Sequence, residues 1–131
     1  MLAFNLQRSA EIFFDDFDTA FATFDGTVIA TRYLKPYLAI RSNGTSECFS
    51  TNIAIAEYFQ RIVANYRRLG CRYCRHKDLS VLEVGSSAAF ASVTWELLDG
   101  DKKMLLSWSE SYNLVRCGST LKACASMDHA R

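Results

Sequence analysis

The sequence has a single proline, only two histidines and no long apolar run, and its charges almost cancel. A membrane-spanning helix needs about 18 or more consecutive apolar residues, so none is expected. Fifteen Lys and Arg against fourteen Asp and Glu give a formal net charge of +1. Nucleic-acid-binding domains usually carry a strong basic excess. We therefore expect neither a membrane nor a nucleic acid as a partner.

The first residues lack a basic segment followed by a continuous apolar segment, and Asp15, Asp16 and Asp18 follow closely. A secretory signal peptide is therefore not expected. Five cysteines are an odd number, and their spacing is irregular. This pattern favours reduced, mostly buried thiols over a disulfide framework. Together these features predict a cytoplasmic protein.

The stretch 69–79, LGCRYCRHKDL, has the residue types of a metal or redox site. Haem attachment requires a histidine directly after the second cysteine, where Arg75 stands. Cys71 follows the end of a predicted helix, where the helix dipole disfavours a thiolate. On a strand, Cys71 and Cys74 would point to opposite faces, and the other histidine, His129, is far along the chain. We interpret the stretch as an ordinary strand and expect no metal and no cofactor.

The region around this stretch is basic, with five arginines, a lysine and two tyrosines over residues 61–77. Aromatic rings among arginines can stack on unpaired bases. The first helix, however, carries several acidic residues. A solvated face, or a complementary contact within a dimer, is therefore the favoured interpretation.

Half of the residues are apolar, which is enough for one domain over residues 1–131 with a core at about 9–127. Helical periodicity predicts helices over 9–24 and 51–69, capped by Ser9 and by Ser50 or Thr51, with a short helix over 27–34 before Pro36. Asn43-Gly44 predicts a hairpin. After Gly70, alternation with period two predicts strands over 71–84, 88–98, 103–117 and 120–127. Three N-terminal helices packed on a strongly curved antiparallel sheet make an α+β domain, with a short hairpin between helices two and three.

This order of elements resembles the nuclear transport factor 2-like superfamily, which includes SnoaL-like (polyketide cyclase-like) and ketosteroid isomerase-like proteins. The resemblance covers about residues 10–129 and is carried by Tyr33-Leu34-x-Pro36 and by the segments IAEYFQRIVANYRRLGCR, AAFASVTWELLDGDKK and WSESYNLVRCGSTLKACAS. Bacterial members of unassigned function share the Trp-x-x-Ser-Tyr-x-Leu-x-Arg strand. Their Gly-Trp-x-Ile signature is replaced here by residues 119–122. The resemblance implies a conical cavity beneath the helices and a homodimer of back-to-back sheets.

Alternation in the predicted strand 103–117 places its large apolar side chains, together with Glu110, on one inward face. A carboxyl group between Trp108 and Tyr112 loses hydration, so its pKa should rise toward that of a general acid or base. We expect Glu110 as the catalytic acid or base, if there is one, with Tyr33 or Tyr112 as a hydrogen-bond donor. The residues expected to line the pocket are Phe17, Tyr33, Tyr58, Trp95, Trp108, Tyr112 and Arg116.

Alternatives remain open at Glu110. It could form an ion pair with Arg116 or with an arginine of the neighbouring strand. The Trp-x-carboxylate pattern is similar to that of the epoxide hydrolases of the superfamily, which need a second carboxylate, for which Asp78 is the nearest candidate, and an arginine. An isomerase of the known type would need an acidic base within residues 35–40, and none is present. The serines at 107, 109 and 111 have no expected histidine partner and indicate a solvent or dimer face.

Three functions follow from this interpretation. The first is a homodimeric domain that binds a small apolar or aromatic molecule in an aromatic pocket. The second is a cofactor-independent isomerase, cyclase or hydrolase that uses Glu110. The third is a structural dimerisation domain whose cone is filled by its own side chains, namely Phe14, Phe17, Phe21, Trp95 and Trp108.

Overall fold

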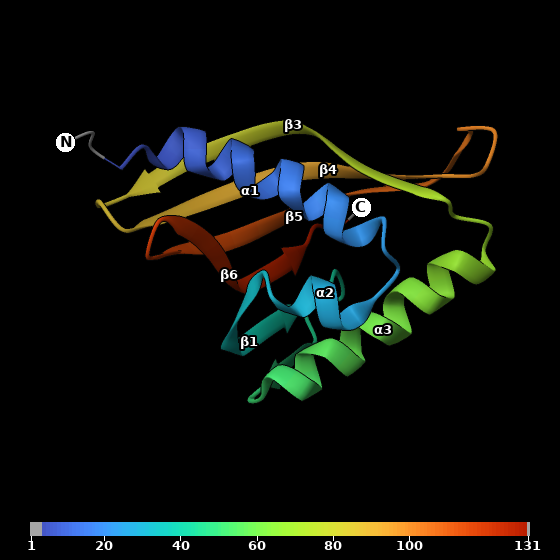
Figure 1. Cartoon of the computed structure of the whole chain (residues 1–131), viewed down its shortest axis with the longest axis horizontal. Helices are drawn as coiled ribbons and strands as arrows, with labels where there is room; N and C mark the ends of the chain where they lie inside the picture. Colours follow the sequence, from blue (N-terminus) through green and yellow to red (C-terminus); the bar gives the residue numbers. More distant parts are fainter. Residues whose placement is uncertain (1–3, 131) are drawn as a thin grey trace.

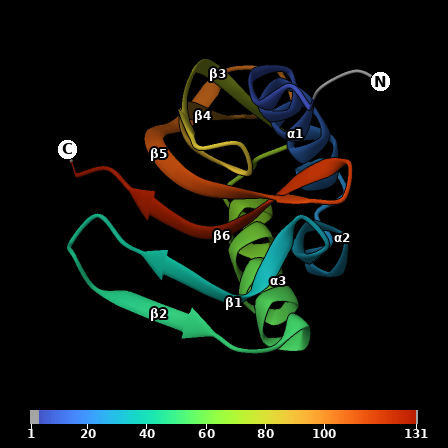
Figure 2. The ribbon, with the colours of Figure 1, turned by 90° about the vertical axis from the view of Figure 1, so that its left-hand side faces the viewer.

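The computed structural model describes residues 4–130, which form three helices and six strands. In chain order these are α1 (Leu6–Phe21), α2 (Gly26–Ala30), β1 (Tyr33–Ile40), β2 (Ser46–Phe49), α3 (Asn52–Arg68), β3 (Tyr73–Val84), β4 (Ala88–Leu98), β5 (Met104–Cys117) and β6 (Thr120–Asp128). The strands form one sheet in the order β2-β1-β6-β5-β4-β3. The helices lie against its concave side (Figures 1 and 2). The predicted α+β architecture is confirmed.

One pairing differs from the antiparallel sheet that the sequence predicts. The β1–β6 pair is parallel, while the other four pairs are antiparallel. The last strand of the chain therefore lies between β5 and the early β1–β2 hairpin (Figure 2). This placement brings the C-terminal residues next to the hairpin loop, which matters for the cavity described below.

The two long helices begin at side-chain caps. Helix α1 begins one turn before the predicted Ser9, because the Asn5 side chain accepts a hydrogen bond from the backbone N–H of Arg8 at 2.9 Å. Helix α3 begins as predicted: Thr51 Oγ1 accepts from the backbone N–H of Ala54 at 3.0 Å. It ends before Gly70, whose φ of +98° is the left-handed geometry expected at that position.

The short second helix was predicted over 27–34, and that prediction is wrong for its second half. Helix α2 ends at Ala30, and Tyr33 already begins a strand. The backbone carbonyl of Arg32 accepts a hydrogen bond from the N–H of Ala123 at 3.0 Å, which attaches this segment to β6. Sheet pairing therefore overrides local helix preference here.

Irregular pairing accompanies the curvature of the sheet. Register shifts occur between Lys77 and Ser80 in β3 and at Cys124 of β6, opposite Asn113 and Leu114 of β5, and Asp78 in the first of these has a φ of +56°. Such bulges bend a strand and increase its twist. The bent sheet and the helices enclose a core rich in aromatic rings.

Helix α1 fills one end of this core. Phe14 and Phe17 are fully buried, and the Phe14 ring meets Tyr112 edge-on at 5.3 Å between centroids. Phe17 packs at 5.5 Å from Trp95. These rings support the cavity wall from behind. In residues 4–130, no helix is long and apolar enough to cross a membrane.

Candidate functional site

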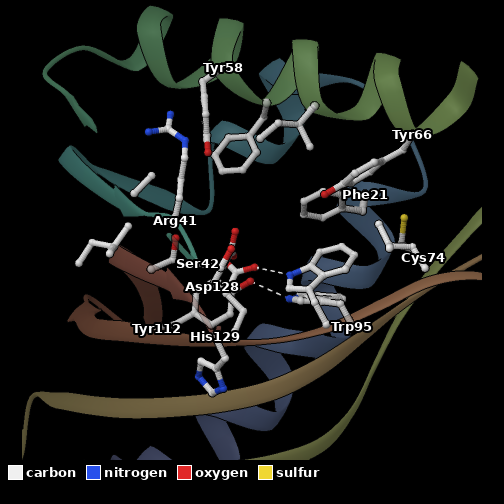
Figure 3. A pocket seen from close by; sticks show the side chains of 18 of the residues that line it. Phe21, Arg41, Ser42, Tyr58, Tyr66, Cys74, Trp95, Tyr112, Asp128 and His129 are labelled. Atoms are coloured by element: carbon white, nitrogen blue, oxygen red, sulfur yellow. Dashed lines mark hydrogen bonds between the residues drawn. The ribbon is translucent and has the colours of Figure 1, made fainter. Parts of the chain in front are cut away.

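The concave side of the sheet encloses a cavity of about 600 Å³ between β1, β5, β6 and helix α3 (Figure 3). Its wall is mainly aromatic, its carboxyl groups come from β5 and β6, and further polar groups come from the β1–β2 loop and from tyrosine hydroxyls of β1 and α3. The lining residues include Phe21, Tyr33, Tyr37, Arg41, Tyr58, Phe59, Tyr66, Cys74, Trp95, Leu106, Trp108, Glu110, Tyr112, Ser126 and Asp128. A partly open space of this size, in which apolar walls are combined with oriented polar groups, is typical of small-molecule sites.

Two carboxyl groups lie side by side in the cavity. Glu110 of β5 is directly opposite Asp128 of β6 in the antiparallel ladder, and residues opposite one another share a face of the sheet. The alternation of the sequence predicted that Trp108, Glu110 and Tyr112 lie on the inward face of β5, and all three line the cavity. Asp128 was not predicted as part of the site.

The environment of Glu110 favours its protonated form. Burial first, and then the negative charge of Asp128, raise the pKa of Glu110 to about 8. The indole Nε1–H of Trp108 donates to Glu110 Oε1 at 2.9 Å and acts in the opposite direction, as does a hydrogen bond from Tyr112. At neutral pH this side chain therefore holds a proton that it can donate.

The tyrosines of the cavity stay neutral. Burial raises the pKa of Tyr33, Tyr66 and Tyr112 above the usual range for a phenol. The Tyr112 hydroxyl accepts a hydrogen bond from Trp95 Nε1 at 2.7 Å. Its own proton is therefore available to donate to Glu110. Figure 3 shows the hydroxyl groups of Tyr58 and Tyr66 pointing from helix α3 into the cavity. These phenols can donate hydrogen bonds to a bound molecule.

Arg41 lies at the edge of the cavity, in the loop between β1 and β2. Its Nη2 is 2.8 Å from Glu47 Oε1, and both side chains are partly exposed. The guanidinium group is thus held by a carboxylate of the hairpin rather than by Glu110 or Asp128. Arg41 was also absent from the predicted site.

The comparison with protein families covers nearly the whole chain. The family described as "NTF2-like protein (DUF6841)" matches residues 8–131. The chain belongs to this NTF2-like family. The resemblance identified from the sequence is therefore confirmed. Among curated proteins, no match was found.

Solved structures show the same NTF2-like fold at low sequence identity. Aln2 from a Streptomyces species has a TM-score of 0.75 and 15% identity, over 95% of this chain and 90% of that one. A putative calcium/calmodulin-dependent protein kinase II association domain from Xanthomonas campestris has a TM-score of 0.71 and 14% identity, over 97% and 89%. A putative scytalone dehydratase from Novosphingobium aromaticivorans has a TM-score of 0.70 and 10% identity, over 93% and 81%. At these identities the likeness concerns the fold alone.

Two residues predicted for the pocket of this NTF2-like chain lie elsewhere. Phe17 is fully buried behind Trp95 and forms part of the core. Arg116 has the expected strand parity, but it is exposed at the end of β5, next to Phe4. Its guanidinium carbon lies 4.0 Å from the centroid of the Phe4 ring, and its Nε donates to the carbonyl of Gly118 at 2.9 Å. An ion pair between Glu110 and Arg116 is therefore not formed.

The remaining predicted residues do line the cavity: Tyr33, Tyr58, Trp95, Trp108, Glu110 and Tyr112. Their roles in binding or catalysis remain predictions. Asp78, the candidate for a second carboxylate, is exposed at the bulge of β3 and is not among the lining residues. Asp128 is the carboxylate that faces Glu110 instead.

The cysteine pair of the 69–79 stretch was expected to divide between opposite faces, and that expectation is wrong. Cys71 precedes β3, so strand alternation does not apply to it, and both thiols are buried with their sulfurs 3.8 Å apart. Burial raises the pKa of the Cys74 thiol well above its usual range. Cys74, which also lines the cavity, is thus protonated at neutral pH and a poor nucleophile. Within residues 4–130 there is no group of three or more His, Cys, Asp or Glu side chains arranged to hold a metal ion.

Both histidines have partners that the sequence did not indicate. Asp18 of helix α1 is partly buried, and its Oδ2 lies 2.8 Å from His76 Nδ1 of β3. Ser111, expected to lack a histidine partner, lies 2.5 Å from His129 Nε2 and 2.8 Å from Ser92 Oγ. The Ser111–Ser92 contact is on the outer face of the sheet, because the strand register places these two residues opposite each other and away from the cavity.

Proposed function

We propose that this NTF2-like chain binds a small, largely apolar molecule in the cavity between the sheet and helix α3. The observation that carries the proposal is the cavity of about 600 Å³ itself, with aromatic walls and a carboxyl pair in its lining. Phe14 and Phe17 lie in the core and leave this space open, which argues against a cone filled by its own side chains. Ligand sites generally combine apolar walls with a few oriented polar groups.

A substitution that fills the cavity tests this function. Leu106 lines the cavity, whereas its neighbour Leu105 is 42% exposed on the other side of the strand. Leu106→Trp should abolish binding of an environment-sensitive apolar fluorophore, and Leu105→Trp should retain it. Titration of each variant with the neutral dye N-phenyl-1-naphthylamine measures the difference, and its anionic analogue 1-anilinonaphthalene-8-sulfonate should bind the cavity more weakly because its sulfonate would lie near the carboxyl pair. Equal binding by both variants would show that the dye does not use this cavity.

A second candidate function is acid–base catalysis at the same site. It is favoured by the juxtaposition of Glu110, which keeps its proton near neutral pH, with Asp128 directly opposite. Carboxyl groups whose proton affinities differ can serve as acid and base in one reaction. If the cavity converts a bound compound, Glu110→Gln should remove turnover and leave binding intact.

We also propose that two copies of the chain associate through the outer face of the sheet, in the cytoplasm. Small hydroxyl side chains occupy the middle of this face, where Ser92 pairs with Ser111 and Thr94 with Ser109. The apolar side chains Leu82, Phe90 and Met127 are exposed around them. A face of this kind can pack closely against a second copy. All five cysteines are free, which supports a reducing compartment.

Sedimentation velocity at micromolar concentration tests the dimer. Phe90 is 40% exposed on the outer face, and Ile53 is 72% exposed on helix α3. Phe90→Lys should convert a dimer into a monomer, because it introduces a charge into the interface. Ile53→Lys should leave the dimer unchanged. A monomeric wild-type protein would refute the proposal.

A further inference from the structure

The carboxyl groups of the cavity are not paired directly with a basic side chain of the described residues. Of the lining residues within the described part of the chain, the acidic ones are Glu110 and Asp128. The arginine of the lining, Arg41, lies at the edge and is paired with Glu47 at 2.8 Å. The His129 ring turns away from the cavity toward Ser111 (Figure 3). Arg41 is close enough to interact electrostatically with Asp128, but among the described residues no basic side chain forms a hydrogen bond or ion pair with Glu110 or Asp128, and the pair faces the open space.

Aromatic rings surround the same space. Tyr37 and Phe59 stack at 5.9 Å, and Tyr66 lies 5.9 Å from Trp108, whose indole also binds Glu110. The faces of such rings attract cations, and the attraction increases when water is excluded. Aromatic faces beside a carboxylate form an environment that favours a substituted ammonium group.

We propose that the ligand of the cavity is a cation, namely an arylalkyl or alkyl amine whose ammonium group lies between the aromatic rings and the Glu110–Asp128 pair. This inference rests on the proposed binding function and specifies its ligand class. A carboxylate ligand would be repelled by the acidic pair. A neutral ligand would displace water from Asp128 without bringing a positive charge next to it, which is unfavourable.

Binding of a cation should also release protons. Glu110 keeps its proton because of burial and because of the charge of Asp128. An ammonium group beside Asp128 offsets that charge, which lowers the pKa of Glu110 and expels part of its proton. The other titratable groups that interact with Glu110 are phenols that stay neutral over the relevant pH range, namely Tyr33, Tyr37, Tyr58, Tyr66 and Tyr112. Proton release at neutral pH would thus come from Glu110.

Isothermal titration calorimetry with three probes of matched shape tests the proposal. The probes are phenylbutylamine, phenylbutanol and phenylbutyrate, each titrated at pH 7 in phosphate and in Tris, which differ in ionisation enthalpy. The amine should bind at least about tenfold more tightly than the alcohol, and the carboxylate most weakly. The apparent enthalpy of amine binding should differ between the buffers by the amount that proton release requires.

Variants assign the effect to the carboxyl pair. Asp128→Asn should remove the preference for the amine and leave alcohol binding unchanged. Asp101→Asn, in the exposed loop between β4 and β5, is the matched control and should behave as wild type. Glu110→Gln should retain amine binding without proton release, and it also serves if Asp128→Asn fails to fold.

The outcomes separate the two proposals. If amine and alcohol bind equally in wild type, the ligand class is wrong and the binding function of the cavity stands. If amine selectivity persists in folded Asp128→Asn, or if proton release persists in Glu110→Gln, the carboxyl pair is not the source of the effect and the inference fails. If none of the three probes binds, and the fluorophores do not bind either, both proposals are overturned.

Discussion

Replacement of Gly26 by alanine should destabilise the protein by about 3 kcal/mol or more, the upper end of the cost of overpacking a rigid contact. Gly26 begins helix α2 where it crosses helix α3. A methyl group at this position would lie 2.6 Å from the backbone nitrogen of Gln60 and even closer to the carbonyl oxygen of Ala56. Both obstacles are backbone atoms of a helix. The strain can therefore be relieved only by moving α2 away from α3.

The same position carries a specific hydrogen bond. The N–H of Gly26 donates to the side-chain carbonyl of Gln60 at 2.8 Å, and the Gln60 amide reaches the carbonyl of Phe24 at 3.4 Å. Separation of the helices would break both contacts and displace the start of β1, which brings Tyr33 to the cavity. Gly26→Ala should therefore lower stability and ligand binding together.

Gly100 provides the control. It lies in the exposed turn between β4 and β5, where an added methyl group meets nothing within 4 Å. Gly100→Ala should change the free energy of unfolding by roughly 0.5 kcal/mol or less, as is usual for exposed sites. Urea denaturation of both variants measures the difference. Similar midpoints for the two would mean that the helices adjust to the extra methyl group.

The long elements were predictable from the sequence because each repeats a strong local signal. The α3 helix has a cap at Thr51, an apolar stripe, and a glycine at position 70 that allows left-handed geometry. Strands β4 and β5 alternate over many residues, so the faces of Trp95, Trp108 and Glu110 followed directly. The region before β1 has no such repetition. An Asp-Gly pair usually indicates the end of a helix, whereas here Asp25 caps α2 and Gly26 permits close helix packing.

Asp128, the second carboxyl group of the pair, was not predicted because its position depends on a register shift between β5 and β6. Strand alternation in the sequence does not reveal such a shift. Near the β5–β6 turn, Leu114 is opposite Ala123, and the same register continued along the strands would place Met127 opposite Glu110. A bulge at Cys124 shifts the register by one residue, so Asp128 takes that place. Strand alternation alone would have turned Asp128 toward the outer face. Arg41 was missed because it reaches the cavity from a loop, where no periodicity applies.

Glu110→Gln should make the protein more stable than wild type at alkaline pH and about equally stable at pH 5. The pKa of this carboxyl group is raised to about 8 in the folded protein, whereas in the unfolded chain it is about 4.3. The folded state thus binds the proton more tightly, and wild-type stability falls as pH rises through that interval. Glutamine resembles the protonated form and does not ionise, so it avoids this loss.

The size of the effect follows from proton linkage. Each tenfold difference in proton affinity between the folded and unfolded states corresponds to about 1.4 kcal/mol in the free energy of unfolding. Water in the open cavity reduces this energy. We therefore expect Glu110→Gln to be more stable than wild type by roughly 2 kcal/mol at pH 9. Thermal unfolding of both proteins at pH 5, 7 and 9 measures the difference. Glu57→Gln, on the exposed surface of helix α3, should show no pH-dependent gain.

Asp128→Asn distinguishes burial from the charge of Asp128 as the cause of the raised pKa of Glu110. Because the charge of Asp128 raises the pKa of Glu110, its removal should lower that pKa and reduce the loss of stability at alkaline pH. A pH-independent difference between Glu110→Gln and wild type would contradict a protonated Glu110. A lower stability of Glu110→Gln at every pH would show that the carboxylate makes a stabilising contact in its ionised form. In either case Glu110 would lose its assignment as the proton donor of the cavity, and acid–base catalysis there would lose its basis.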